Sequence, residues 1–384
     1  MTETIKLYDL DSHLCQFEAM VLSCEKNGDN YEIILDKTAF FPEGGGQEAD
    51  TGVIGDANVL DVQISSGIIT HFADKALEIG KEYNCKLEYE KRFRRMQNHS
   101  GEHIVSGLIH RHFGFDNVGF HMGHEDVTLD INGVLSDDDI GMIEILANKA
   151  VCENVPIICE YPSSDILGTL EYRSKLDLTE NVRIVTIDGY DACACCAPHV
   201  SRTGEIGIIK LLDHEKNKGG TRIHLLCGFD ALADYDSRYR MICEAARSLS
   251  VKQDKLGEAL KRLENEISEL KQKNYELRSA LSEYKIAEIG PTDGNICIFE
   301  EEATQSDMRK LMNACCEKCG GICAVFSGND MTGYTFVATS KNADLRALSA
   351  DMREKLMAKG GGSCDMIQGS VKSTKEEIKK YFGV

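Results

Sequence analysis

The sequence predicts an α+β protein built from four consecutive parts, and three observations support that class. Short apolar runs alternate with turn residues near the N-terminus, which is the pattern of β-strands. Apolar residues then recur with heptad spacing across 251–287, and the C-terminal region alternates strand and helix patterns. We therefore expect a β-barrel at 1–90, a mixed α+β domain at 91–230, a helical coiled-coil segment at 231–289 and a small α/β domain at 290–384.

The composition is that of an ordinary globular chain of 384 residues, with 42% hydrophobic and 28% charged side chains. No apolar run approaches the roughly 18 residues of a membrane span, and the first residues do not form a signal peptide. Sixteen cysteines without an export signal indicate reduced thiols and metal ligands rather than disulfides. We expect a cytoplasmic protein with no membrane contact.

The net charge of −20 argues against a surface coated for nucleic-acid binding. The segment Lys91–Arg95 is nevertheless a local basic patch. It is either the solvated start of a helix or a nucleic-acid contact made through Arg92, Arg94 and Arg95.

In the expected barrel, apolar strands at 31–35, 52–54, 59–64 and 68–71 are separated by turn residues. Between them lies a run of three glycines, Gly44, Gly45 and Gly46. Such a run marks a loop that turns tightly or approaches a ligand closely, and a plain turn is the alternative.

The expected second domain contains two pairs of metal ligands. His99 and His103 are four residues apart on a predicted helix, so their side chains lie on one face, and Cys195 and His199 repeat the spacing. Imidazole and thiolate ligands suit tetrahedral zinc, so we expect one Zn²⁺ per chain. Cys193 is an alternative ligand.

Other elements of this domain follow from local signals. Ser136, followed by three aspartates, predicts the start of a helix that continues to about Cys152. Strands are expected at 183–187 and 207–212. Glu102 lies between the two helical histidines and could act as a base, but its helical position favours a solvated carboxylate.

The heptad segment predicts a long helix that begins at a capping box of Ser250 and Gln253 and ends at Gly290. Leucine recurs at one of the two seam positions of each heptad, and Asn274 is a single polar residue at the other. This pattern favours a parallel homodimer through 251–287 over packing of the helix within the chain. The C-terminal domain should contain strands at 296–299, 323–326 and 334–338. Four cysteines there are expected to be core thiols, with a second zinc as the alternative: Cys315, Cys316, Cys319 and Cys323.

Together these motifs resemble the editing half of alanyl-tRNA synthetases, and most closely the free-standing alanyl-tRNA editing proteins of the long AlaX type. Phe40–Gln47 with Asp50-Thr-Gly52 resembles the barrel motif of that family, and the four expected zinc ligands fall where its ligands fall. The glycine-rich segment Gly360–Gly369 resembles the domain that follows the editing domain and also accompanies DHH phosphoesterases. One departure is Cys195-Cys-Ala-Pro-His199 where the family has Cys-Gly-Gly-Thr-His, which affects substrate contacts more than zinc binding.

The resemblance implies hydrolysis of the ester that links a wrong amino acid, serine or glycine, to alanine tRNA. A pocket that admits alanine cannot strongly reject serine, so a second site must recognise the hydroxyl. By the resemblance, Thr38 reads that hydroxyl and Gln47 lies near the ester. The three glycines and the three arginines are further candidates for substrate or tRNA contact, because of the close approach that glycine allows and because of the positive charge.

The chain begins in the barrel and has no Asp-His-His motif, so neither aminoacylation nor phosphoesterase activity is expected. The alternative function is a catalytically weak, zinc-dependent RNA-binding and dimerisation protein.

Overall fold

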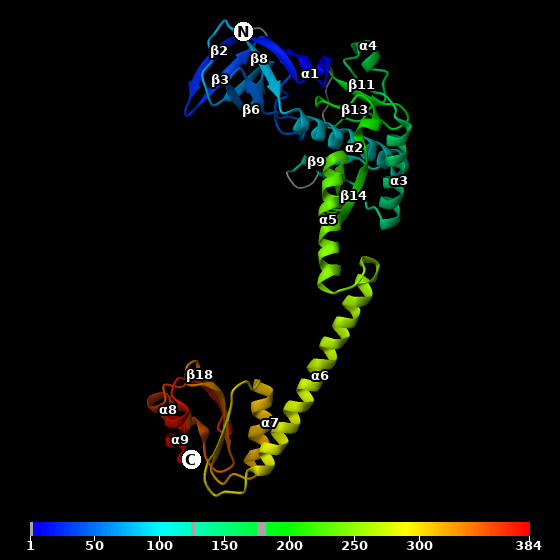
Figure 1. The fold of residues 1–384 in the computed structure, drawn as a ribbon. Coiled ribbons are helices and arrows are strands. Elements are labelled where there is room, and N and C mark those ends of the chain that lie inside the picture. The colour runs from blue at the N-terminus through cyan, green and yellow to red at the C-terminus, as the bar shows by residue number, and fades with distance from the viewer. Residues whose placement is uncertain (1–2, 124–126, 175–181) are drawn as a thin grey trace. The chain divides into compact units, whose positions relative to one another are not determined.

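The structure is a computed structural model that describes residues 3–123, 127–174 and 182–384. The chain divides into two compact units, Met1–Ala245 and Ala246–Val384, each with its own sheets and helices (Figure 1). The predicted α+β class is confirmed. Within the described ranges, no helix is both long enough and apolar enough to cross a membrane.

Six antiparallel strands of the first unit close into a barrel in the order β2-β3-β7-β6-β5-β8. Their bounds are β2 Gln16–Asn27, β3 Asn30–Leu35, β5 Gly52–Ile54, β6 Ala57–Ser65, β7 Ile68–Ala73 and β8 Glu82–Leu87. Beside them lie β1 (Ile5–Lys6), which pairs in parallel with β4 (Lys37–Thr38), and the short helix α1 (Leu7–Leu10). Alternate residues of these strands, such as Ile33 and Leu35, point into a closed apolar core.

The rest of the first unit surrounds the helix α2 (Tyr89–Phe113), as Figure 1 shows. A four-stranded sheet has the order β14-β15-β10-β9, and a three-stranded sheet has the order β11-β12-β13. The elements are β9 Asn117–Met122, β10 Val127–Ile131, α3 Asp137–Glu153, β11 Ile157–Glu160, α4 Ser164–Leu167, β12 Ile184–Ile187, β13 Asp191–Ala194, the 3₁₀ helix Thr203–Ile206, β14 Ile209–Asn217, β15 Gly220–Cys227 and α5 Gly228–Ser248.

The predicted cap at Ser136 is confirmed. Its hydroxyl accepts a hydrogen bond from the Asp139 amide and the Asp139 carboxylate accepts one from the Ser136 amide, so the two form a capping box. The helix α3 ends at Glu153, one residue from the predicted end.

Helix α2 is almost entirely enclosed between Arg92 and Ile109, which is unusual for a helix rich in polar residues. Two glycines make the close packing possible. A Cβ on Gly101 would lie 2.2 Å from Cys227 Sγ, and one on Gly107 would lie 2.3 Å from the Tyr190 carbonyl oxygen. The buried polar side chains of this helix therefore face neighbouring segments directly, and they form the site described below.

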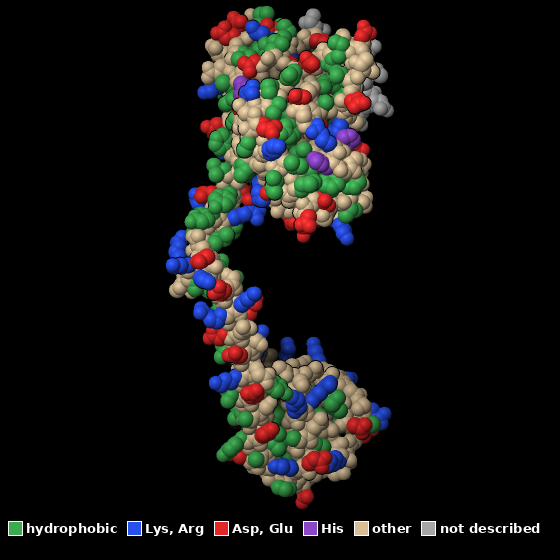
Figure 2. Space-filling view, turned by 90° about the vertical axis from the view of Figure 1, so that its right-hand side faces the viewer, with side chains coloured by type: hydrophobic (Ala, Val, Ile, Leu, Met, Phe, Trp, Pro, Cys, Tyr) green, Lys and Arg blue, Asp and Glu red, His purple; other side chains and the backbone are tan. Residues whose placement is uncertain are grey.

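The second unit is a five-stranded sheet with the order β16-β17-β18-β20-β19, covered by helices. Its elements are α6 Leu256–Glu288, β16 Ile296–Glu300, α7 Gln305–Cys316, β17 Ile322–Asn329, β18 Gly333–Ser340, α8 Leu345–Lys355, β19 Lys359–Gly362, β20 Met366–Val371 and α9 Lys375–Phe382. The three strands predicted here are confirmed. Acidic and basic side chains are interspersed on the face drawn in Figure 2.

The expected start of the long helix is wrong. Ser250 has a left-handed backbone with φ of 54°, and α6 begins only at Leu256, after a 3₁₀ turn over Gln253–Lys255. A left-handed residue cannot continue a helix, so Ser250 separates α5 from α6 instead of capping the latter. The end of α6 at Glu288, just before Gly290, agrees with the prediction.

Candidate metal centre on helix α2

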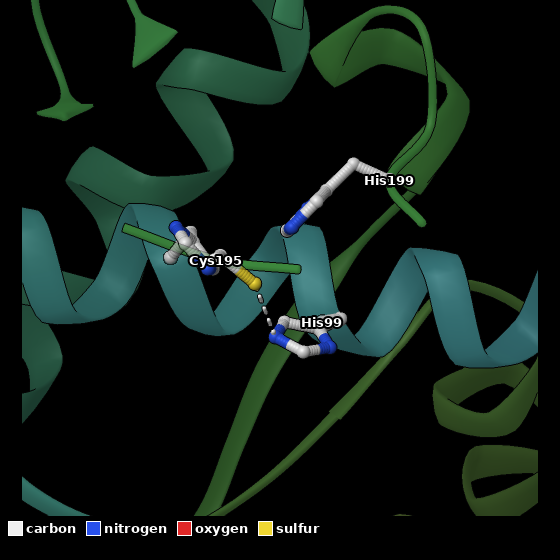
Figure 3. A group of neighbouring side chains, drawn as sticks. His99, Cys195 and His199 are labelled. Atoms are coloured by element: carbon white, nitrogen blue, oxygen red, sulfur yellow. Dashed lines mark hydrogen bonds between the residues drawn. The ribbon is translucent and has the colours of Figure 1, made fainter. Parts of the chain in front are cut away.

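The two ligand pairs predicted from the sequence meet in one cluster. His99 and His103 lie one turn apart on α2, and Cys195 and His199 lie in the segment that follows β13 (Figure 3). One ligand atom from each of the four residues lies within 4.8 Å of the others. Cys195 Sγ is 3.5 Å from His99 Nε2. In a tetrahedral zinc site a sulfur and a nitrogen ligand are about 3.6 Å apart and two nitrogen ligands about 3.3 Å apart, so the distance between Cys195 Sγ and His99 Nε2 fits a shared metal ion.

All three histidines are held by their Nδ1 atoms, which leaves each Nε2 free to face the cluster. The Nδ1 contacts are His99 with Gln47 Oε1 at 3.2 Å, His103 with Asp191 Oδ2 at 2.9 Å, and His199 with Ser100 Oγ at 3.0 Å. Such second contacts fix the tautomer and the ring orientation of metal-binding histidines. His199 Nε2 is buried and has no hydrogen-bond partner among the described residues, which is the state expected of an atom that binds a metal.

The electrostatics of the cluster favour a thiolate beside neutral or hydrogen-bonded imidazoles. Removal from water alone would raise the pKa of Cys195, but His99, His103 and His199 outweigh it and hold that pKa well below its ordinary value. Burial lowers the pKa of His199 to about 3, so this ring is a neutral donor at physiological pH.

A second group of ligand-type residues, Asp191 and Cys193 with His103, adjoins the first. Arg173 occupies the place that a second cation would need, because its Nε and Nη2 donate to the two Asp191 oxygens at 2.8 and 2.9 Å. The guanidinium already neutralises the carboxylate. We therefore assign Asp191 and Arg173 to the support of His103 and not to a second metal.

The three glycines and Gln47 form a hairpin turn beside the cluster, with Gly45 and Gly46 as its two central residues. Gly44 and Gln47 exchange both backbone hydrogen bonds at 3.0 Å, while Gly45 and Gly46 have φ values of 62° and 83°. A turn with two left-handed central residues strongly favours glycine. The turn places the Gln47 side chain in the cluster, where its buried Nε2 has no partner among the described residues.

Thr38 lies in the barrel interior with its hydroxyl already engaged. It is 2.9 Å from His71 Nε2 and accepts the Phe40 amide at 3.1 Å. His71 Nδ1 contacts the Ile33 carbonyl, so Nε2 is the acceptor and the Thr38 hydroxyl donates to it. One oxygen lone pair of Thr38 remains to accept a further hydrogen bond.

The basic patch requires a correction. Arg92 is fully buried, where it pairs with Asp50 and donates to the Ala39 carbonyl, and Arg95 is nearly buried between Glu48 and the Ala49 carbonyl. Neither guanidinium is placed to contact RNA, because both point inward from α2 and bind acidic side chains and carbonyl oxygens of the barrel region. Arg94 alone of the three is on the surface, where it pairs with Asp230.

Glu102 also differs from expectation. We expected a solvated carboxylate, but Glu102 is 3% exposed and is bound by Ser106 Oγ and by Asn117 Nδ2. The close packing of α2 closes the side that an isolated helix would leave to water. Its hydrogen-bond partners lie on α2 and β9 and are not among the four candidate ligands.

Sequence reasoning missed the supporting residues Asp191, Arg173 and Ser100. Asp191 and Ser100 are near ligands in the sequence, but a carboxylate or a hydroxyl at such a position has no distinctive pattern. Arg173 follows a loop and gives no signal at all. Their roles became visible only when segments about ninety residues apart came together.

Comparison with known proteins agrees with this geometry. The family model of the threonyl and alanyl tRNA synthetase second additional domain matches residues 182–224, which include Cys195 and His199. The model of class II (A) tRNA synthetases matches residues 11–91, which form the barrel and its glycine turn.

Similar chains extend the match to the whole sequence. The alanyl-tRNA editing protein AlaX-L of Pyrococcus horikoshii is 28% identical over 97% of this chain and 96% of its own. The alanyl-tRNA editing protein Aarsd1 of Danio rerio is 29% identical over 69% of this chain and 68% of its own. The alanine–tRNA ligase of Pyrococcus abyssi is 29% identical over 97% of this chain, which spans only 42% of that ligase.

The likeness to an editing protein runs through almost the whole of both chains and includes the segments that build the metal cluster. The chain is therefore similar to alanyl-tRNA editing proteins over nearly its whole length, and this similarity supports an editing hydrolase that acts on aminoacyl-tRNA.

Proposed function

We propose that this protein is a trans-editing hydrolase that deacylates alanine tRNA mischarged with serine, and also with glycine, and that it holds one Zn²⁺ per chain. The observation that supports this most directly is the preorganised cluster on α2. Three histidines turn Nε2 toward a cysteine of lowered pKa, beside a glycine turn that the family uses in its barrel motif.

The donor set of three imidazoles and one thiolate suits zinc, whose preference for nitrogen and sulfur ligands is well established. A bound ion would supply a positive charge that shapes the pocket and positions the ester. Four protein ligands favour this positioning role, and exchange of one ligand for substrate is the alternative.

The residues of the chain perform the rest of the reaction. Gln47 Nε2 is a buried donor that has no partner within the described part of the chain, and we infer that it binds an oxygen of the ester. A water then attacks the ester carbonyl, with help from the ribose hydroxyl or from polar side chains, and the bond to the ribose oxygen breaks. The products are the free amino acid and a tRNA with an intact 3′ end.

Thr38 remains the proposed reader of the serine hydroxyl. Its own proton is committed to His71, so it accepts the serine O–H through its remaining lone pair. Thr38→Val removes this acceptor with little change in shape. Loss of one buried hydrogen bond of about 1–3 kcal/mol should reduce the preference for seryl- over alanyl-tRNA by about one to two decades. His71→Asn is the control for disturbance of the pair, and unchanged preference in Thr38→Val would assign selection to another residue.

The primary test is deacylation of seryl-, glycyl- and alanyl-tRNA for alanine by the purified protein. We expect rapid release of serine and slow release of alanine. If no amino acid is released above the buffer rate while tRNA still binds, the alternative function applies, a zinc-dependent RNA-binding protein with little catalysis.

Homodimerisation through α6 is a second proposal, supported by the exposed seam of that helix. Leu260, Ile267, Leu270, Leu277 and Leu281 are each about half exposed or more, at heptad-related positions. Helices with this spacing bury the seam against a partner helix, and a second copy offers the same seam. Light scattering should give a dimer for the wild type and a monomer for Leu270→Lys with Leu277→Lys. Lys273→Ala, outside the seam, is the control, and a monomeric wild type would refute the dimer.

A cytoplasmic location and the four-part domain division remain predictions.

A further inference from the structure

One aromatic side chain that is not a candidate ligand contacts the cluster of four ligands. The ring of Phe120, on strand β9, is centred 5.0 Å from the ring of His99 and inclined to it by 47°. Among the described residues, the other rings that contact His99 are the ligands His103 and His199 themselves. Phe120 is half-buried, whereas all three histidines are buried. It therefore lies between the cluster and the solvent.

The glycine turn holds Phe120 at this place. A Cβ on Gly46 would lie 2.8 Å from Phe120 Cδ1 and 2.9 Å from the Phe120 carbonyl oxygen, so only glycine allows the approach. The Met122 amide donates to the Gly46 carbonyl at 3.2 Å, which ties β9 to the turn. Strand β9 is also an edge strand of its sheet, and its neighbouring residues Val118 and His121 are exposed.

We propose that Phe120 is the stacking platform for the terminal adenine of the bound tRNA. The inference rests on the proposed function, because it places the aminoacyl ester at the cluster. The adenine is attached to the same ribose as the ester, so the base must lie against the first surface outside the cluster. Phe120 provides that surface.

The chemistry of both partners supports this assignment. Proteins bind unpaired bases by stacking them on aromatic rings, and each such contact contributes about 1–3 kcal/mol. A phenyl ring offers no hydrogen bond to a serine hydroxyl, so it suits the base better than the amino acid. Stacking also needs no positive charge, which is an advantage in a chain with a net charge of −20.

The chain contains no tryptophan, so Phe120→Trp creates a single fluorescent reporter at this position. Uncharged alanine tRNA with an intact CCA end should quench this fluorescence, and the same tRNA lacking only the terminal adenosine should not. Binding of both RNAs is measured in parallel by filter retention. Phe229→Trp places the reporter on an exposed ring of α5 and should show no dependence on the terminal adenosine. Equal quenching of Phe120→Trp by the two RNAs, or none despite binding, would overturn the proposal.

Kinetics supply an independent readout. Phe120→Leu keeps an apolar side chain against His99 but has no aromatic face, so KM for seryl-tRNA should rise about 5- to 150-fold with kcat within about twofold. Phe120→Tyr should keep KM near the wild-type value, and both variants should retain their zinc. A KM unchanged in Phe120→Leu, or an altered preference between serine and glycine with KM unchanged, would contradict a base platform. If the wild type deacylates nothing, the proposed function fails, while the fluorescence experiment still decides the role of Phe120.

Discussion

Two cysteine-rich segments of this chain look alike in sequence but differ in chemistry. Cys195 lies among three histidines in the first unit, and the surrounding imidazoles hold its pKa well below the ordinary value of a thiol. Cys315, Cys316 and Cys323 are buried in the second unit, where removal from water raises the pKa of each. Spacing of cysteines therefore does not by itself identify a metal site.

The difference comes from the neighbours. The second segment includes a Cys-x₂-Cys step, but its thiols pack with Met308, Leu311 and Val325. Cys323 Sγ donates to the Met312 carbonyl and Cys319 Sγ to the Gly294 carbonyl. No ligand group was found there among the described residues, and the expectation of core thiols agrees with this environment.

The largest effect is expected from replacing Cys195, because only the first of the two cysteine segments is proposed to hold zinc. Cys195→Ala removes one of the four proposed zinc ligands, so we expect loss of bound zinc and of seryl-tRNA deacylation. Metal analysis of the purified variant and a deacylation assay measure both. Retention of zinc together with the full rate would show that Cys195 is not a ligand.

The next effect concerns the support of the cluster. Asp191→Asn keeps the size of the side chain but removes the charge that His103 and Arg173 both contact. Loss of such a supporting contact typically costs 10- to 100-fold in metal affinity. Competition with a chromogenic chelator measures the affinity. Asp188→Asn, nearby in the same turn, is the control, and equal affinities in the two variants would remove Asp191 from this role.

Two buried histidines, His103 at the cluster and His71 in the barrel, differ in pKa in the same way as the two groups of thiols. His103 has Asp191 and Cys195 as acceptors, which overcome the effect of burial and hold its pKa well above the ordinary value. His71 in the barrel has only the Thr38 hydroxyl and the Ile33 carbonyl, so burial lowers its pKa to about 4. Burial therefore acts in the same direction on both rings, and an acidic partner reverses the outcome.

The His71 shift predicts an acid-sensitive barrel. The unfolded chain, with a histidine pKa near 6.5, binds a proton more readily than the folded one. Stability is therefore complete above pH 6.5 and falls as the pH drops toward 4, by about 2 kcal/mol at pH 5. Urea unfolding at pH 7.5 and pH 5 measures this for the wild type and for His71→Asn. Equal losses in the two proteins would show that His71 does not titrate as proposed.

The smallest effect belongs to the second cysteine segment. Cys323→Ala leaves a small cavity and should lower the free energy of unfolding by about 1 kcal/mol. Zinc content and deacylation rate should equal those of the wild type, in contrast to Cys195→Ala. A loss of metal in this variant would point to the second zinc site that the sequence left open.

The sequence by itself determined the features that depend on short range. The ligand pairs of α2 and of the Cys195 segment follow from helical or loop spacing, the cap at Ser136 from its own aspartates, and the glycine turn from backbone conformation. Each of these features depends on residues only a few positions apart in the sequence, so local sequence patterns are enough to predict it.

Tertiary structure alone decided what surrounds these residues. Arg92 points inward because it pairs with Asp50, 42 residues away. His103 is held by Asp191, which in turn accepts hydrogen bonds from Arg173. Phe120 came to touch His99 only because β9 is tied to the glycine turn. The energy of a buried charge or ring depends on its partners in distant segments of the chain, and the sequence of one segment alone does not predict which partners these are.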